Sequence, residues 1–446
     1  MNENQKKLIR GFSKLTKQAK LDWIITSFFN KTQSVYHEMS SFWLQDDKQQ
    51  QIIDGFSENT VSNFILPYSV CPNLMVNDNI YCVPMVTEES SVVAAAASAA
   101  KFWLERGGFK TQILGTQKIG QVHIKWDGSF QELLDGWQVL EPAFRKTIQP
   151  LVHNMEQRGG GVKEMSWKDF TNEIPGYYQA FVKFETCDSM GANFINTILE
   201  ELGKALGEHF NVLRDDQLEV IMCILSNYTP DCLVRVSVSC PVSQLKDSSI
   251  PIDAEDFASL FNTAIRIAEI DPYRATTHNK GIFNGIDAVV IATGNDFRAV
   301  EACGHTYAAR SGSYSSLSHC NIEHGIFEFW MDFPMAVGTV GGLTKLHPLA
   351  QKSNELLGNP SAETLMQIIA ATGLAQNFAA IRSLVTTGIQ KGHMKMHLQN
   401  ILQQLSAADN ETELVLQHFE HHVVSFNAVR TFLHDIRNSK AAQLSN

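Results

Sequence analysis

The segment ETCDSMGANFIN, residues 185–196, combines an acid, a glycine and two asparagines at a predicted junction between a strand and a helix. Alternating apolar and polar residues at 178–186 indicate the strand, and the apolar spacing after Asp188 becomes helical. A helix start exposes backbone N–H groups that bind phosphate or carboxylate, and the small Gly191 and Ala192 would let a flat ligand approach the backbone. Because an ordinary capped turn gives the same pattern, the segment needs support from elsewhere in the chain.

Support comes from four further segments: VPMVTEESSVVAAA at 83–96, YRATTHNKGIFNGIDAVVIATGNDFRA at 273–299, GTVGG at 338–342 and TTGIQKGHMKMH at 386–397. Together with DSMGAN they resemble the motifs of 3-hydroxy-3-methylglutaryl-coenzyme A (HMG-CoA) reductases in the soluble bacterial (class II) form, over nearly the whole chain. The resemblance implies that HMG-CoA is reduced to mevalonate and coenzyme A by two hydrides from NADPH or NADH. The same site would run the reaction in reverse.

The resemblance also implies four catalytic residues. Lys280 would stabilise the oxyanion, and Glu89, with Glu88 as the fallback, would donate a proton to the aldehyde oxygen. Asp296 would lie between the lysine and the glutamate, and His393 would protonate the departing coenzyme A thiolate.

Each of these residues has a plainer interpretation. Lys280 falls in a polar segment that we predict to be a loop before a strand at 287–293, where a lysine could simply be solvated. Asp296 could cap the helix that follows it. Glu88 and Glu89 could interact favourably with the dipole of the alanine-rich helix that they precede. His393 and His397 could share a metal, but no HExxH motif and no nearby Cys or Asp cluster supports one, so we expect no metal.

The remaining motif residues are assigned to binding by the same resemblance. Arg274 and Ser91 would hold the free carboxylate of the substrate, because arginine donates two parallel hydrogen bonds to a carboxylate. Asn227 and Asn284 would fix the thioester end and Lys280. The nicotinamide and pyrophosphate path would be lined by Asp188, Met190, Gly191, Asn193, Gly338 and Gly341. By itself, the glycine run could be only a tight turn.

The choice of cofactor rests on a weaker pattern. The chain has no GxGxxG segment, so an ordinary Rossmann domain is not expected. The extra phosphate of NADPH requires basic groups, whereas NADH selection usually requires an acid. The last part of the helix before Gly159, residues 145–156, offers Arg145, Lys146, His153, Asn154 and a single acid, Glu156, which favours NADPH over NADH.

Composition narrows the class of protein and its partners. The chain has 446 residues, of which 44% are hydrophobic and 19% charged, as in a globular protein of two or three domains. A net charge of −11 argues against nucleic acid or an anionic membrane as a partner. No apolar run could span a membrane and no signal peptide is apparent, so we expect a cytoplasmic enzyme. The family implies a homodimer or a dimer-based oligomer.

The predicted elements indicate an α+β fold. A large mixed α/β domain, residues 1–109 and 227–387, would be interrupted by a small domain at 110–226 and followed by a C-terminal helical flap at 388–446. The small domain has the order β-α-β-β-α-β, which is the ferredoxin-like arrangement. The alanine-rich helix that ends near 107–108 is predicted to be the buried central helix of the large domain.

Two other functions remain open at this point. The chain could be a hydrolase or lyase of acyl-coenzyme A thioesters that uses Asp296 and His393 without a nicotinamide. It could also be a non-catalytic coenzyme A-binding homologue. The presence of all four reactive side chains argues against the second alternative.

Overall fold

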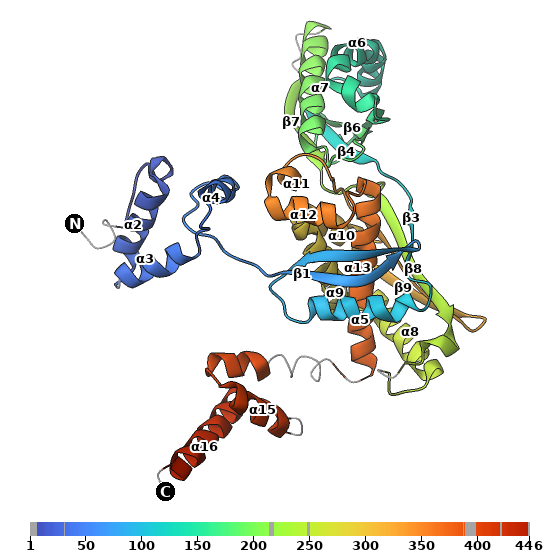
Figure 1. Cartoon of the computed structure of the whole chain (residues 1–446). Coiled ribbons are helices and arrows are strands. Elements are labelled where there is room, and N and C mark those ends of the chain that lie inside the picture. Colours follow the sequence, from blue (N-terminus) through green and yellow to red (C-terminus); the bar gives the residue numbers. More distant parts are fainter. Residues whose placement is uncertain are drawn as a thin grey trace.

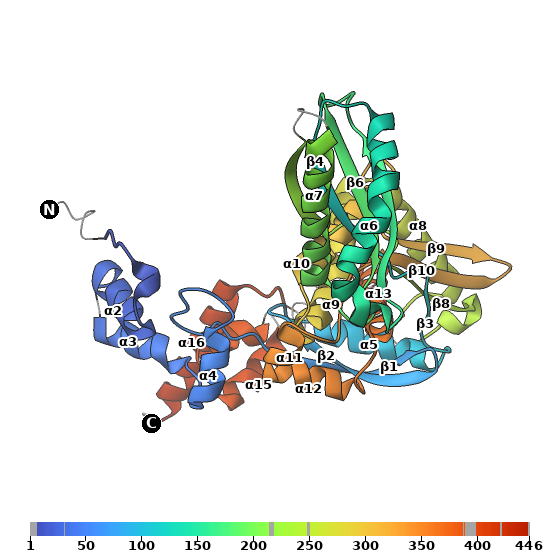
Figure 2. The same ribbon diagram turned by 90° about the horizontal axis from the view of Figure 1, so that it is seen from above.

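The computed structural model describes residues 7–30, 32–213, 218–247, 250–386, 388, 398–419 and 422–444. A large body carries the smaller domain at one end, and the helices near both termini stand outside this body (Figure 1). Figure 2 shows the small domain from above, with its two long helices α6 and α7 side by side.

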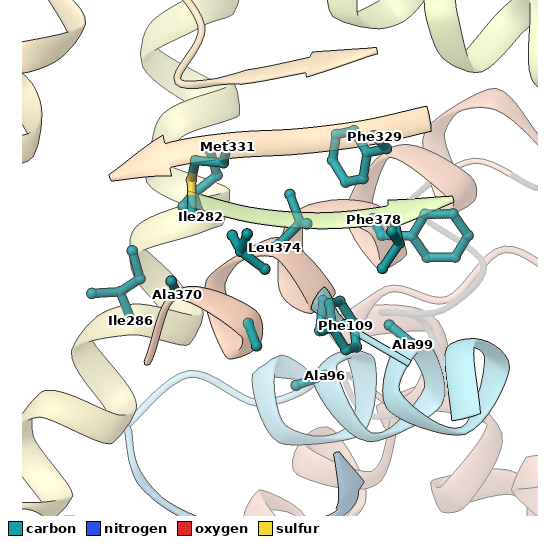
Figure 3. Close-up of a cluster of buried hydrophobic side chains, with 14 of the residues drawn as sticks. Ala96, Ala99, Phe109, Ile282, Ile286, Phe329, Met331, Ala370, Leu374 and Phe378 are labelled. Atoms are coloured by element: carbon teal, nitrogen blue, oxygen red, sulfur yellow. The ribbon is translucent and has the colours of Figure 1, made fainter. Parts of the chain in front are cut away.

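The large body is built around the helix α13 (Ala362–Val385), which is buried on nearly every side. Three helices pack against it: α5 (Val92–Leu104), α8 (Ala254–Ile270) and α9 (Pro272–Ala292). Apolar side chains from these helices and from the adjoining sheet converge in one core, as Figure 3 shows for Phe329, Leu374 and Phe378. The predicted central role of the alanine-rich helix was therefore wrong, because α5 buries one face and α13 occupies the centre.

Glycines set the separation of α9 and α13. A Cβ on Gly285 would lie 2.8 Å from the carbonyl oxygen of Thr372, and one on Gly373 would lie 2.7 Å from Cγ1 of Ile286. Real Cβ atoms do not approach other atoms so closely. The two helices therefore make backbone contact, which fixes the position of every residue that α9 presents.

An antiparallel four-stranded sheet with the order β3-β8-β10-β9 lies against these helices. Its strands are β3 (Lys110–Ile113), β8 (Leu233–Pro241), β9 (Ser318–Glu323) and β10 (Ile326–Pro334). Alternate residues of β8 and β10 are buried, as expected of a sheet with one face on the core. A separate hairpin, β1 (Tyr68–Val76) with β2 (Asn79–Val86), packs on α5 and α9.

The small domain has a second antiparallel sheet, with the order β5-β6-β4-β7 and its own apolar core. Its elements are β4 (Lys118–Lys125), α6 (Phe130–Glu156), β5 (Gly161–Asp169), β6 (Tyr177–Glu185), α7 (Ala192–Leu213) and β7 (Glu219–Ser226). This order is that of the predicted ferredoxin-like fold.

The two ends of the small domain meet at the large sheet. The strand β3 pairs with β8 of the large body, so the expected start of the small domain at residue 110 is too early. Directly after β3, the Leu114 N–H donates to the Leu233 carbonyl at 2.8 Å, which closes the insertion. The sequence alone could not assign β3 to either sheet, because the strand-like pattern of residues 110–125 is interrupted only at Gly115.

The other described elements lie outside these two sheets and their covering helices. They are η1 (Phe12–Lys14), α2 (Lys17–Phe28), α3 (Thr32–Ser41), α4 (Asp47–Asp54), η2 (Val242–Leu245), α10 (Phe297–Ala308), α11 (Leu343–Leu346), α12 (Pro348–Leu356), α15 (Asp409–His418) and α16 (Phe426–Leu444). A helical segment at 398–404 joins α15 and α16 in a separate apolar cluster. Within the described ranges, α13 is the one helix long and apolar enough to cross a membrane, and 72% of its apolar window is buried inside the protein.

Candidate active site

Lys280 and Glu89 meet although they are 191 residues apart in the chain. The Lys280 Nζ lies 2.5 Å from Oε2 of Glu89, and the two side chains are 59% and 38% exposed. Glu89 stands in the turn between β2 and α5, where its N–H donates to the Thr87 hydroxyl at 3.2 Å. Ser91 begins α5 with a left-handed φ of 80°, a conformation that a serine adopts at a cost in free energy. The turn therefore presents Glu89 outwards to the lysine.

Lys280 is on a helix and not in the predicted loop. The segment at 287–293 is also helical up to Ala292, so the predicted strand there was wrong. The polar residues around Lys280 suggested a loop, but His278 and Asn279 are buried and anchor the helix. His278 Nε2 lies 2.7 Å from the Ser318 hydroxyl, and burial lowers the pKa of this imidazole to about 3, which keeps it neutral.

Asn279 completes this anchorage of α9. Its amide donates to the Ser315 carbonyl at 2.9 Å, and its oxygen accepts from the Leu317 N–H at 3.0 Å. A buried amide satisfied on both sides is a rigid attachment. The two anchors hold one face of α9 in the body while Lys280, the next residue along, points to solvent.

The expected substrate residues lie in two places. Arg274 and Asn284 are on α9 with Lys280, and Asn284 follows the lysine by four residues on the same helix face. Arg274 is half-buried, burial lowers the pKa of its guanidinium, and it has no ion-pair partner among the described residues. Asn227 instead lies between β7 and β8, where it lines a small cavity.

Asp296 does not join Lys280 and Glu89 within one chain. Its carboxylate caps α10 by accepting from the N–H groups of Arg298 at 3.1 Å and Ala299 at 3.2 Å. Lys280 lies 12 residues before the end of α9, which corresponds to about 18 Å of helix, and Asp296 lies beyond that end. The expected cluster of one ammonium and two carboxyls is thus reduced to a pair, and in the single chain Asp296 caps α10 and pairs with Arg298 at 3.5 Å.

The DSMGAN turn and the GTVGG run, by contrast, are in contact. The Thr339 N–H donates to the Asp188 carbonyl at 2.8 Å, and the Asp188 carboxylate accepts from the Ala362 N–H at 2.8 Å. A Cβ on Gly338 would lie 2.5 Å from the Met190 nitrogen, so glycine is needed there for the backbones to approach. Gly338 also donates to the Asn295 side chain at 2.8 Å, next to Asp296.

The other expected cofactor residues complete this junction. Gly191 has a φ of +84° and precedes the first turn of α7, where Asn193 also lies. Gly341 has a φ of +83° with no atom near its Cβ position, so the glycine run is open on that side. The small side chains and free helix start fit a flat, anionic dinucleotide.

The sequence interpretation missed two features. Lys118, at the start of β4, is 4% exposed and lines the same cavity as Met190 and Asn227. Asp287 on α9 has one buried carboxylate oxygen with no hydrogen-bond donor. Burial, the charge of the adjacent Glu301 with its side-chain contact, and the charge of Glu88 raise the pKa of Asp287 to about 8. For Asp287 the sequence signal was an acid at the start of the apolar run 288–292, whereas the residues around Lys118 give no such signal.

His393 and the rest of 389–397 lie outside the described residues. Among the residues that are described, no three His, Cys, Asp or Glu side chains are grouped as a metal would require.

The fold and site define a class of protein. An outward lysine–carboxyl pair on a mixed α/β body, next to a glycine-lined junction with a ferredoxin-like domain, is typical of an enzyme that acts on a carbonyl group with a bound nucleotide. Comparison with known proteins makes this specific. The family model for hydroxymethylglutaryl-coenzyme A reductase matches residues 23–398.

Individual relatives agree with the family model. The 3-hydroxy-3-methylglutaryl-coenzyme A reductase of Archaeoglobus fulgidus is 36% identical over 372 residues, 82% of this chain and 81% of the relative. A class II reductase from Streptococcus pneumoniae bound to NADPH superposes with a TM-score of 0.70 at 38% identity, covering 84% of this chain and 99% of that one. A second structure from that organism has a TM-score of 0.71 at 36% identity, over 96% and 99%.

The chain belongs to the hydroxymethylglutaryl-coenzyme A reductase family. It is an oxidoreductase that reduces HMG-CoA to mevalonate. This confirms the expected fold class, family and reaction. Neither the thioester hydrolase or lyase nor the non-catalytic homologue has support from these comparisons.

Proposed function

We propose that the contact between Lys280 and Glu89 marks the reacting centre. Each reduction step places negative charge on the former carbonyl oxygen, and the exposed ammonium of Lys280 would stabilise that charge. Glu89, within hydrogen-bond reach of the same ammonium, would give the oxygen a proton when it is itself protonated, and would be left as the carboxylate. The 2.5 Å contact between two motif residues so distant in sequence is the observation that carries this assignment.

Substrate binding would extend along α9. Arg274, half-buried and without a partner among the described residues, is available for the free carboxylate of HMG-CoA, together with Ser91. Asn284 and Asn227 would hold the thioester end, and Asn284 shares the helix face of Lys280. A half-buried cation without a counter-ion has the character of a ligand site, because its burial otherwise costs free energy.

The cofactor would bind where DSMGAN and GTVGG meet, along Asp188, Met190, Gly191, Asn193, Gly338 and Gly341. When bound, a reduced nicotinamide supplies the hydride. The Streptococcus pneumoniae relative is described as bound to NADPH, and we assign NADPH as the preferred cofactor here, with NADH as the alternative. In the helix expected to select it, Arg145 is paired with Glu141 at 2.8 Å, so Lys146 is the freer cation.

We further propose that Asp296 and His393 complete the site in a homodimer or dimer-based oligomer. The separation of Asp296 from Lys280 along α9 supports a contribution from a second copy. The exposed state of Lys280 and Glu89 also supports it, because a proton-donating carboxyl requires shielding from water. Apolar residues available for such a contact include Phe64, Ile65 and Ile80, which are 93%, 62% and 64% exposed. His393 would protonate the departing thiolate from the C-terminal flap. We place the enzyme in the cytoplasm.

Steady-state turnover tests this assignment. The full-length protein should oxidise NADPH when HMG-CoA is added, and Lys280→Ala should abolish that oxidation without loss of the folded state. Lys352→Ala, at an exposed lysine on α12, is the matched control and should keep full activity. Release of coenzyme A without cofactor oxidation would instead favour a hydrolase, and unchanged turnover in Lys280→Ala would remove the proposed centre.

A further inference from the structure

Lys118 is a buried cation without a partner in the described parts of the chain. Only 4% of the residue is exposed, yet its ammonium has neither a hydrogen bond nor an ion pair there. An unpaired buried charge costs several kcal/mol even after relaxation of its surroundings, so proteins retain one only where something else compensates it. The Lys118 ammonium is therefore available to a ligand group that enters the space it faces.

The nearby carboxylates do not compensate it. Glu185 and Asp188 are the acids that act with Lys118 on the Cys187 thiol. Glu185 accepts from the Thr116 hydroxyl and from the Cys187 N–H at 2.8 Å. Asp188 accepts from the Ala362 N–H at 2.8 Å. Both acids hold other donors and neither is within ion-pair distance of Lys118.

The lysine instead faces a cavity between the two domains. The cavity is lined from the small domain by Lys118, Met190 and Ala192, which belong to β4 and to the start of α7. From the large body it is lined by Ala299 of α10 and by Ala336, which lies two residues before the glycine run. An unpaired ammonium and the start of a helix thus converge on one small space, and both attract electron-rich oxygen.

We propose that the Lys118 ammonium binds an oxygen on the nicotinamide-nucleotide half of the cofactor. That oxygen is either the carboxamide carbonyl or the adjacent phosphate. This inference rests on the proposed cofactor path between DSMGAN and GTVGG. It adds a binding residue from β4, a strand to which the motifs assign no role.

The experiment compares Lys118→Met with Lys125→Met in the full-length protein. Both lysines are on β4, but Lys125 is exposed. Loss of one charge-assisted hydrogen bond should raise the Kd for NADPH about tenfold in Lys118→Met and leave it unchanged in Lys125→Met. The KM for HMG-CoA should change less than twofold in both variants.

Thermal stability separates ligand binding from a structural role. Removing an ammonium that has no partner in the described structure should not lower the Tm of the protein without cofactor, whereas breaking a structural ion pair would lower it. Lys118→Gln, a smaller change in polarity, serves as the second variant and should show the same loss of NADPH affinity. A thionicotinamide analogue of NADPH identifies the oxygen. If the carboxamide is the partner, the Lys118 substitutions should raise the Kd for the analogue less than the Kd for NADPH, because sulfur is a weak acceptor. If the phosphate is the partner, the substitutions should raise both Kd values equally.

Three results would overturn the proposal. One is an unchanged NADPH Kd in both Lys118 variants while the wild type binds and oxidises NADPH, which leaves the proposed function intact. Another is a raised KM for HMG-CoA with unchanged cofactor affinity, which would assign the lysine to the thioester. The third is a wild-type protein that does not bind NADPH, which would overturn the proposed cofactor path as well.

Discussion

Two residues on α9, Arg274 and Lys280, bring positive charge to the proposed site. The chain carries a net charge of −11, so anionic ligands must be attracted by local cations. Arg274 and Lys280 lie on one helix, and Arg274 is without a partner among the described residues. Concentrating cations on a helix that is anchored by two buried polar side chains sets their positions more precisely than a surface loop would.

Arg274→Lys should separate binding from chemistry. A lysine keeps the charge but loses the planar pair of donors that matches a carboxylate. We expect the KM for HMG-CoA to rise about tenfold while kcat changes less than threefold, because the carboxylate is held equally before and during the reaction. Steady-state kinetics at saturating NADPH measure both constants. A fall in kcat at constant KM would place Arg274 in the chemical step.

Asp287 should make stability depend on pH. Burial and the neighbouring Glu301 raise the pKa of Asp287 to about 8, whereas an unfolded aspartate titrates near ~4. Between these values the folded protein holds a proton that the unfolded chain has lost. The free energy of unfolding should therefore fall as the pH rises from about 4 to about 8.

Asp287→Asn tests this dependence, because its amide can donate to Glu301 without a proton from solution. Denaturant unfolding across that pH range should show a shallower decline in the variant than in the wild type. Asp78→Asn, at a side chain that is 80% exposed, should leave the wild-type slope unchanged. If Asp287→Asn shows the same dependence of unfolding free energy on pH as the wild type, Asp287 is ionised across this range.

At the scale of elements, the contact between α9 and α13 should tolerate added side-chain atoms less than any other part of the large body. Gly285→Ala places a methyl group 2.8 Å from the Thr372 carbonyl oxygen, so one helix must shift, at a cost of about 1–3 kcal/mol. Gly281→Ala on the same helix meets no atom within 4 Å and should stabilise by about 0.5–1 kcal/mol. Thermal unfolding of the two variants measures the difference. Equal effects would mean that the helices are not in backbone contact.

The sequence predicted some elements well because their patterns are local. The helices and strands of the small domain follow clear periodicities, and their order was enough to identify the ferredoxin-like arrangement. For α9 the pattern failed. Buried His278 and Asn279 look like loop residues, and the apolar run at 288–292 looks like a strand because a helix buried on most sides loses its periodicity.

The site, like the secondary structure, was predicted from the sequence only in part. Motif resemblance predicted Lys280 and Glu89 as catalytic residues, and the two are in contact across 191 residues, a relation that no local pattern contains. It also predicted that Asp296 would join them, which the single chain does not show. Lys118 was missed because its signal is a matter of burial and absent partners, and neither is visible in a sequence.

At the scale of the whole molecule, the separation of Asp296 from Lys280 makes the oligomer part of the catalytic argument. If each site takes Lys280 and Glu89 from one copy and Asp296 from another, a dimer contains two shared sites. Each copy would then be incomplete alone. The exposure of Lys280 and Glu89 in the single chain fits this arrangement.

Complementation between two inactive variants tests the shared site. Lys280→Ala and Asp296→Asn should each be inactive, but a mixed dimer of the two has one site with both residues intact. Co-expression should therefore restore about a quarter of wild-type turnover, since half of randomly formed dimers are mixed and one of their two sites is complete. Light scattering of the same samples should give the mass of a dimer or a multiple of it. A co-expressed sample without activity, in which mixed dimers are verified by differential tags, would place Asp296 and Lys280 in the same copy and require α9 and α10 to rearrange during catalysis.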